Sequence, residues 1–252
     1  MADDARLDAP EAPGGLAFPA YRRSRGVHPP VLHPAYLSTC LRAPRRPPLH
    51  LPHGLTEVTG PLLGVREVDV DDADLTRGHA GEPLGERIIV TGRVVDESGR
   101  GVADTLVEIW QANAAGRYAH DLDRHPAPLD PNFTGVGRCL TNARGLYRFV
   151  TVRPGAYPWR NHHNAWRPAH IHLSILGRAF VQRLVTQMYF PGDPLMAHDP
   201  ILTSIPDPAA RQRLVATWSP QVTEPEWALG YEFDIVLRGR EATPLRPAAG
   251  DG

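Results

Sequence analysis

The residues best suited to chemistry lie between positions 157 and 172, in Tyr-Pro-Trp-Arg-Asn-His-His-Asn-Ala-Trp-Arg-Pro-Ala-His-Ile-His. The segment runs into Leu-Ser-Ile-Leu, an apolar stretch typical of a buried strand. Because side chains alternate faces along a strand, His170 and His172 are expected to point the same way, roughly 6.5 Å apart. Two such imidazoles can bind one metal ion, although the same short pattern also arises in ordinary packing. The neighbouring Trp166 and Arg167 favour a metal-binding pocket.

Three tyrosines lie in segments where each could serve either a functional site or the core. Tyr118 follows an expected strand, Tyr147 stands in Gly-Leu-Tyr-Arg-Phe, and Tyr157 stands in the rigid turn Pro-Gly-Ala-Tyr-Pro-Trp. A lone tyrosine more often lies at the edge of a core with its hydroxyl hydrogen-bonded. Composition alone does not separate the three.

The overall composition excludes several function classes. The 252 residues include 27 basic and 28 acidic ones, a balance that gives no electrostatic argument for binding nucleic acid or an anionic membrane. No apolar run approaches the roughly 20 residues that span a bilayer, and the polar N-terminus lacks a signal-peptide pattern. Cys40 and Cys139 fit neither a disulfide framework nor a CxxC site. We therefore expect a cytoplasmic protein.

Proline and glycine divide the chain into three expected regions. Their 27 and 23 copies stand between short apolar runs, which favours an all-β antiparallel sandwich with few short helices. Residues 1–84 are expected to form an irregular, proline-rich arm that wraps over another surface, with residues 61–83 as a linking loop whose acidic run is solvated. The sandwich is expected over residues 85–240, followed by a tail over residues 241–252.

Alternation and turn residues place the elements of the sandwich. One helix is expected over residues 208–217, with Asp207 as N-cap and Pro208 as its first residue. The expected strands cover residues 87–95, 104–112, 138–141, 146–152, 170–176, 181–190 and 232–238.

Several longer motifs, in order along the chain, carry a resemblance to a known family. They occupy residues 85–90, 110–118 (Trp-Gln-Ala-Asn-Ala-Ala-Gly-Arg-Tyr), 128–133, 135–141, 157–161, 166–172 and 233–239. Over about residues 30–240 the chain resembles the intradiol ring-cleaving dioxygenases and, within them, the β chains of the members that cleave protocatechuate. The resemblance is far more specific than His-Ile-His alone.

The resemblance implies a non-haem Fe(III) site with four protein ligands, Tyr118, Tyr157, His170 and His172. Phenolates are hard anionic donors that suit a trivalent ion, and imidazole is acceptable to iron as it is to zinc. The family pattern further implies that Tyr157 leaves the metal to accept a substrate proton. It also implies that Arg167 stabilises negative charge building on the ring, while Tyr147 remains a structural residue.

The resemblance also implies the substrate and the partner. Protocatechuate (3,4-dihydroxybenzoate) and O2 would give 3-carboxy-cis,cis-muconate in the β-ketoadipate pathway of aromatic catabolism. A homologous α chain would complete the active site. Four further residues match positions that line the family's substrate pocket: Tyr36, Trp159, Gln187 and Ile201.

Two alternatives stay open at this point. Cleavage of catechol or hydroxyquinol is less favoured, because those relatives begin with a helical dimerisation segment that the proline-rich arm does not provide. A binding module, or a zinc site on the same histidines, is distinguished by metal analysis and by the absence of a tyrosinate-to-iron colour. The other histidines are expected to be structural or exposed, with His162 and His163 facing solvent.

Overall fold

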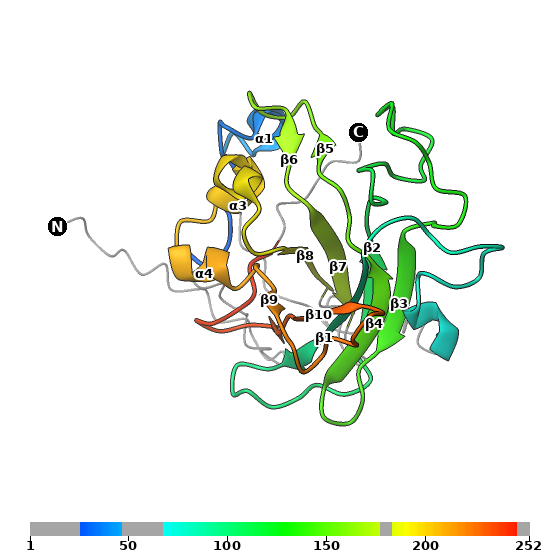
Figure 1. Ribbon diagram of the computed structural model, residues 1–252. Helices are drawn as coiled ribbons and strands as arrows, with labels where there is room; N and C mark the ends of the chain where they lie inside the picture. The colour runs from blue at the N-terminus through cyan, green and yellow to red at the C-terminus, as the bar shows by residue number, and fades with distance from the viewer. Residues whose placement is uncertain (1–25, 47–67, 177–182, 246–252) are drawn as a thin grey trace.

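The computed structural model describes residues 26–46, 68–176 and 183–245 (Figure 1). The strands are β1 (Arg87–Val95), β2 (Leu106–Trp110), β3 (Val136–Leu140), β4 (Leu146–Val152), β5 (Tyr157–Pro158), β6 (Trp166–Arg167), β7 (His170–Leu176), β8 (Arg183–Tyr189), β9 (Thr217–Trp218), β10 (Leu229–Glu232) and β11 (Ile235–Val236). The helices are α1 (Leu37–Arg42), η2 (Val70–Ala73), η3 (Pro194–His198), α3 (Pro200–Thr203) and α4 (Pro208–Gln212). Every helix in these ranges is too short or too polar to cross a membrane.

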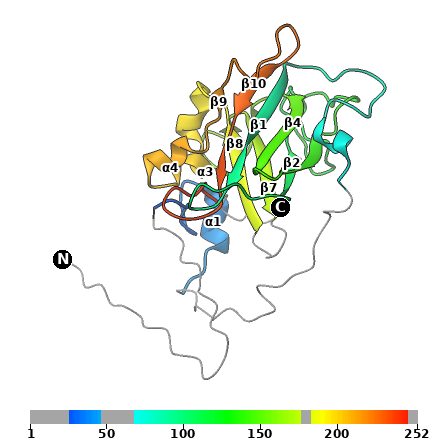
Figure 2. The same cartoon turned by 90° about the horizontal axis from the view of Figure 1, so that it is seen from below.

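Two stacked sheets form the centre of the fold, which confirms the predicted sandwich. One sheet has the order β11-β1-β10-β9, with β4 also paired to β1, and the other has the order β3-β2-β7-β8 (Figures 1 and 2). All pairs in the second sheet are antiparallel. In the first sheet, however, β1 runs parallel to both β10 and β11. A third, two-stranded unit consists of β5 and β6.

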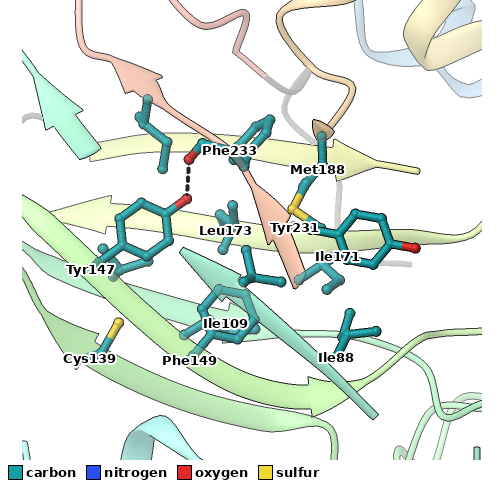
Figure 3. Packing of buried hydrophobic residues seen from close by; sticks show 14 of the residues in the cluster. Ile88, Ile109, Cys139, Tyr147, Phe149, Ile171, Leu173, Met188, Tyr231 and Phe233 are labelled. Atoms are coloured by element: carbon teal, nitrogen blue, oxygen red, sulfur yellow. Dashed lines mark hydrogen bonds between the residues drawn. The ribbon is translucent and has the colours of Figure 1, made fainter. Parts of the chain in front are cut away.

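Alternation along the strands fills the space between the two sheets. Ile171 and Leu173 of β7 pack with Phe149 of β4 and Ile88 of β1 in one apolar cluster (Figure 3). The intervening positions of β7 are His170 and His172, which consequently face away from this cluster. The core thus fixes the register that puts both histidines on the outer face of the four-stranded sheet.

The strand expected over residues 232–238 is two strands in the structure. β10 ends at Glu232, and β11 begins at Ile235; both pair with β1. Between them the Asp234 carboxylate accepts the backbone N–H of Arg93, where a ladder bond would otherwise form. A Cβ at Gly92 would lie 1.9 Å from the Phe233 carbonyl oxygen, so glycine permits this close approach.

The expected helix begins where predicted and ends early. Asp207 accepts the N–H of Ala209, and Pro208 opens α4, as the capping pattern indicates. The helix stops at Gln212 because the chain then joins the sheets: Val215 forms a bridge with Tyr189, and β9 begins at Thr217.

The described part of the arm is irregular except for the short helices α1 and η2, as the prolines predict. The acidic run forms the short helix η2, closed by reciprocal bonds between Asp69 and Asp72. Asp69 and Asp71 are exposed, as expected, whereas Asp72 and Asp74 are half-buried, and Asp72 pairs with Arg138 of β3 at 2.8 Å. Residues 1–25, 47–67 and 246–252 lie outside the described ranges, so those parts of the arm and tail stay predictions, as does the boundary at residue 84.

Tyr147 lies inside the sandwich, where its hydroxyl donates to the Phe233 carbonyl (Figure 3). Burial raises the pKa of this phenol well above its usual value, so the hydroxyl stays protonated as a donor. We expect Tyr147→Phe to lower the free energy of unfolding by about 1–3 kcal/mol, because a buried carbonyl loses its partner. Urea unfolding measures this, and a variant as stable as the parent contradicts it.

Candidate active site

The outer face of the four-stranded sheet carries a row of aromatic and polar side chains. Cross-strand register places Trp110 of β2 opposite His172 of β7, and His172 opposite Gln187 of β8. His170 lies opposite Tyr189 in the same way. The Trp110 and His172 rings stack in parallel with centroids 4.8 Å apart. Strand pairing alone therefore assembles the floor of the site.

Two tyrosine hydroxyls reach the two imidazoles. Tyr118 Oη lies 3.1 Å from His172 Nε2, and Tyr157 Oη lies 3.3 Å from His170 Nε2. The phenol rings meet edge to face with centroids 5.4 Å apart. His170 Nδ1 is 2.7 Å from the Pro168 carbonyl oxygen, which only accepts, so Nδ1 carries the proton and Nε2 presents its lone pair. The structure thus brings together all four predicted ligands.

Glycines allow the two tyrosine-bearing loops to approach each other. Gly116 has a φ of +79°, and a Cβ there would lie 2.1 Å from the Ala156 carbonyl oxygen. A Cβ at Gly155 would lie 2.5 Å from the Ala114 carbonyl oxygen. The Asn113 carbonyl accepts the N–H groups of both Gly116 and Gly155, each at 3.0 Å. One backbone group therefore ties the Tyr118 loop to the Tyr157 loop.

Arg167 lies beside the four donors, held in the hairpin formed by β5 and β6. It pairs with Tyr157 across the hairpin, and its side chain is 1% exposed. Its Nη2 donates to Asp199 Oδ2 at 2.7 Å and to Gln187 Oε1 at 2.8 Å. Its Nη1 lies 3.1 Å from His170 Nε2. A fixed cation thus borders the candidate metal-binding atoms.

The charge of this cation is secured by its partner. Burial alone would lower the pKa of the Arg167 guanidinium, but Asp199 and the nearby phenols raise it well above its usual value. Burial would likewise raise the pKa of the Asp199 carboxyl, yet Arg167 holds it below its usual value. Both groups are therefore charged at neutral pH in a place that water does not reach.

The predicted substrate-contact residues gather on the same side. Tyr36, from the start of α1, is buried with its ring 5.0 Å from that of Trp159. The Arg167 guanidinium lies 5.2 Å from the centre of the Trp159 ring. Ile201 of α3 is buried, and its N–H donates to Asp199 at 3.1 Å. In Figure 1 α1, α3, β5 and β6 lie at the same end of the fold.

The expectation that His162 and His163 both face solvent is right for His163 and wrong for His162. His162 is 3% exposed, and its ring centre lies 5.8 Å from that of Trp159. The hairpin loop turns it inward, because the His162 carbonyl accepts the Ala165 N–H and the Ala165 carbonyl accepts the Trp159 N–H. Burial lowers the pKa of this imidazole, which favours the neutral form.

The sequence resembles known proteins over most of its length. Residues 58–239 match the family described as Dioxygenase, and residues 21–54 match the protocatechuate 3,4-dioxygenase beta subunit N terminal. The chain is 59% identical over 220 residues to the protocatechuate 3,4-dioxygenase beta chain of Burkholderia cepacia, covering 86% of this chain and 93% of that one. The chain belongs to the intradiol dioxygenase family.

Two further relatives show how the family varies. The alpha chain of the Pseudomonas putida protocatechuate 3,4-dioxygenase is 31% identical over 161 residues, which cover 63% of this chain and 75% of that one. The crystal structure of 3-chlorocatechol 1,2-dioxygenase from Rhodococcus opacus 1CP has a TM-score of 0.52 and 23% identity, covering 68% of this chain and 66% of that chain. The latter supports the intradiol dioxygenase fold.

The donor set fits the iron that intradiol dioxygenases generally use. Two phenol oxygens and two imidazole nitrogens converge, and phenolates favour a hard trivalent ion. Within residues 26–46, 68–176 and 183–245, no group of three or more His, Cys, Asp or Glu side chains gathers as an alternative metal site. A hollow between η2 and β3, lined by residues such as Leu75 and Arg138, contains none of the candidate ligands.

Sequence reasoning missed three residues around this site. Trp110 stands in the same motif as Tyr118, and the two-residue alternation of β2 is a signal that could have placed it on the outer face. Tyr189 and Asp199 carry no comparable local signal. They reach the site only through the register of β8 with β7 and through the chain turn into α3.

Proposed function

We propose that the chain is the β subunit of an αβ protocatechuate 3,4-dioxygenase, acting in the β-ketoadipate pathway of aromatic catabolism. Its substrates would be protocatechuate and O2, and its product 3-carboxy-cis,cis-muconate. The observation that carries the proposal is the convergence of Tyr118, Tyr157, His170 and His172 beside a buried Arg167. The 59% identity to the Burkholderia cepacia beta chain supports the same reaction.

The proposed metal is Fe(III), held by the two phenolates and the two imidazoles. When bound, the ion would supply Lewis acidity toward the two catechol oxygens. The protein prepares the donors in advance. The Pro168 carbonyl sets the tautomer of His170, and the stacked Trp110 ring limits rotation of His172.

Tyr157 is proposed to take a proton from the substrate. A catechol must lose both hydroxyl protons to bind as a dianion, and a phenolate is a base of suitable strength. Tyr157 comes from the two-residue strand β5, its side chain is half-buried, and we propose that it is the tyrosine that leaves the metal. Tyr118, by contrast, lies between His172 and a loop whose Asn113 side chain accepts two backbone N–H groups, from Ala115 and Arg117.

Arg167 is proposed to stabilise the negative charge that develops on the ring as it reacts. Its Nε and Nη2 donate to Asp199, which leaves the Nη1 edge facing the candidate metal-binding atoms. A preorganised cation in a site without water interacts more strongly with developing charge than the same cation in solvent. This role requires no movement of the side chain during the reaction.

Four residues are proposed to contact the aromatic ring or its carboxylate. The Tyr36 ring packs against Trp159, Trp159 lies against the Arg167 guanidinium, and Ile201 is bound through its N–H to Asp199, the partner of Arg167. Gln187 lies on the floor, with its Nε2 3.2 Å from His172 Nδ1 and its Oε1 bound to Arg167.

Protocatechuate is favoured over unsubstituted catechol by the N-terminal part of the chain. Residues 21–54 match the N terminal of the protocatechuate-cleaving beta subunit, and this segment contributes Tyr36 to the site. The helices in the described part of the arm are α1, six residues long, and η2, four residues long, so these residues offer no long helical dimerisation segment.

The proposed partner is a homologous α chain. The relatives include both a beta chain and alpha chains of protocatechuate 3,4-dioxygenases, and this chain resembles the beta chain over more of its length. Leu37 and Leu41 of α1 are exposed, and Leu37 directly follows Tyr36 in the chain, so we propose that a partner chain covers this helix.

Co-expression with the candidate α chain tests the whole proposal. The purified complex is expected to contain about one iron per αβ pair, to be burgundy-red and to consume one O2 for each protocatechuate opened. Turnover of unsubstituted catechol is expected to be much slower. A colourless, zinc-loaded protein, or equal turnover of the two substrates, argues against the proposal.

Tyr157→Phe is expected to change the visible absorption and lower kcat/KM for protocatechuate by about 10²-fold, because proton acceptance and one phenolate ligand are both lost. Stopped-flow spectroscopy under nitrogen should show slower substrate binding. Tyr147→Phe is the matched control and should leave the spectrum unchanged, since Tyr147 lies in the sandwich core. An unchanged spectrum in Tyr157→Phe refutes its assignment as a ligand.

A further inference from the structure

A buried carboxylate, that of Asp199, holds the Arg167 side chain in its orientation. Asp199 is 0% exposed, and both of its oxygens receive the guanidinium: Nε donates to Oδ1 at 3.3 Å and Nη2 donates to Oδ2 at 2.7 Å. This paired arrangement fixes the plane of the guanidinium as well as its position. The Nη1 nitrogen, 3.1 Å from His170 Nε2, is the one that faces the candidate metal site.

Asp199 is itself held in place from two sides. Its Oδ1 accepts the Ile201 N–H at 3.1 Å, as the N-cap of α3. The Tyr189 hydroxyl lies 2.8 Å from Oδ2 and 2.7 Å from Gln187 Oε1. The carboxylate therefore links the arginine to the helix that carries Ile201 and to the sheet floor that carries Gln187.

We propose that Asp199 is a positioning residue that aims Arg167 Nη1 at the charge developing on the ring. The inference rests on the proposed function, because it gives Arg167 that task. Neutral acceptors such as Gln187 and Tyr189 do not define the guanidinium plane, since each meets only Nη2. Without the carboxylate, the buried guanidinium loses both its charge partner and the contacts that orient it.

Binding of the substrate and stabilisation of the charge that develops during the reaction should respond differently to the orientation of Arg167. Arg167 should matter little for substrate affinity, because the negative charge it stabilises appears only as the ring reacts. Losing its orientation should therefore lower kcat and leave KM nearly unchanged. A purely structural Asp199 would instead alter stability and leave the ratio of kcat to KM as it was.

Asp199→Asn in the αβ complex tests this. Asparagine is a good N-cap, so α3 is retained while the charge and one orienting bond are lost. We expect kcat for protocatechuate to fall about 10- to 100-fold, since misplacement of a catalytic group by about 1 Å has such an effect. KM, the iron content and the affinity for 4-hydroxybenzoate, read from its effect on the visible spectrum, should each change less than about threefold.

A double-mutant cycle shows whether Asp199 acts through Arg167. If it does, Arg167→Met combined with Asp199→Asn should be no slower than Arg167→Met alone. If the losses in kcat of the two single variants multiply in the double variant, the proposal is overturned. An unchanged kcat in Asp199→Asn would also overturn it. A wild-type complex that does not open protocatechuate would overturn the proposed function and this inference with it. If the wild type is active and the Asp199→Asn variant is equally active, only this inference fails.

Two further variants keep the test decisive if Asp199→Asn folds poorly. Tyr189→Phe keeps the carboxylate but removes one of its partners, and it should lower kcat in the same direction by about two- to fivefold. The double variant Asp199→Asn, Arg167→Met lacks both charges. It should unfold at a higher temperature than the single variant Asp199→Asn, because no unpaired cation stays buried. The opposite order of melting temperatures, or an unaltered kcat in Tyr189→Phe, contradicts the proposed coupling.

Discussion

A His170→Ala variant is expected to retain almost no iron and to lose at least about 10³-fold in kcat/KM, more than the loss typical of mutations beyond the ligands themselves. His170 is buried, its tautomer is set by Pro168, and its Nε2 lies between Tyr157 Oη and Arg167 Nη1. Iron analysis of the purified αβ complex and oxygen consumption with protocatechuate measure the two effects.

The matched control is His163→Ala, in the nearby hairpin loop. His163 is exposed, so its removal should leave iron content, colour and turnover unchanged. Circular dichroism distinguishes loss of the metal from loss of the fold, because β7 is also held by its apolar face. A folded His170→Ala protein with full iron occupancy would remove this histidine from the ligand set.

Period-two alternation explains why the sequence predicted that His170 and His172 share one face of the sheet. Ile171 and Leu173 must enter the sandwich core, and this requirement alone turns His170 and His172 outward. The choice of Tyr118 and Tyr157 over Tyr147 did not come from any such pattern. It came from the family resemblance. In the structure Tyr147 is buried in the core and the other two hydroxyls lie beside the histidines, and their role as ligands stays a prediction.

The parts that sequence reasoning missed depend on contacts between distant segments. Asp199 meets Arg167 across 32 positions of the chain. The break between β10 and β11 depends on Gly92, whose missing Cβ admits the Phe233 carbonyl. His162 is turned inward by two backbone bonds within its own loop. In each case the local residues permit more than one conformation, and packing elsewhere selects among them.

Gly116→Ala is expected to cost about 3 kcal/mol of stability, as the sum of left-handed strain of about 1–2 kcal/mol and a similar cost for backbone displacement. The φ of +79° disfavours alanine, and its Cβ would lie 2.1 Å from the Ala156 carbonyl oxygen. That carbonyl belongs to the residue before Tyr157, so the displacement moves one proposed ligand away from the other. We expect a melting temperature lower by roughly 6–12 °C, together with reduced iron content and altered visible absorption.

Gly99→Ala is the control that introduces the backbone strain without the steric contact. Gly99 has nearly the same φ, +77°, but an added Cβ there would meet nothing within 4 Å. This variant should therefore cost only about 1 kcal/mol, from the backbone conformation alone, and should bind iron normally. Equal losses of stability in the two variants would mean that the Tyr118 and Tyr157 loops do not depend on their close approach. A Gly116→Ala protein that is destabilised yet keeps the parent spectrum would mean that the loops can move apart without displacing the tyrosine oxygens.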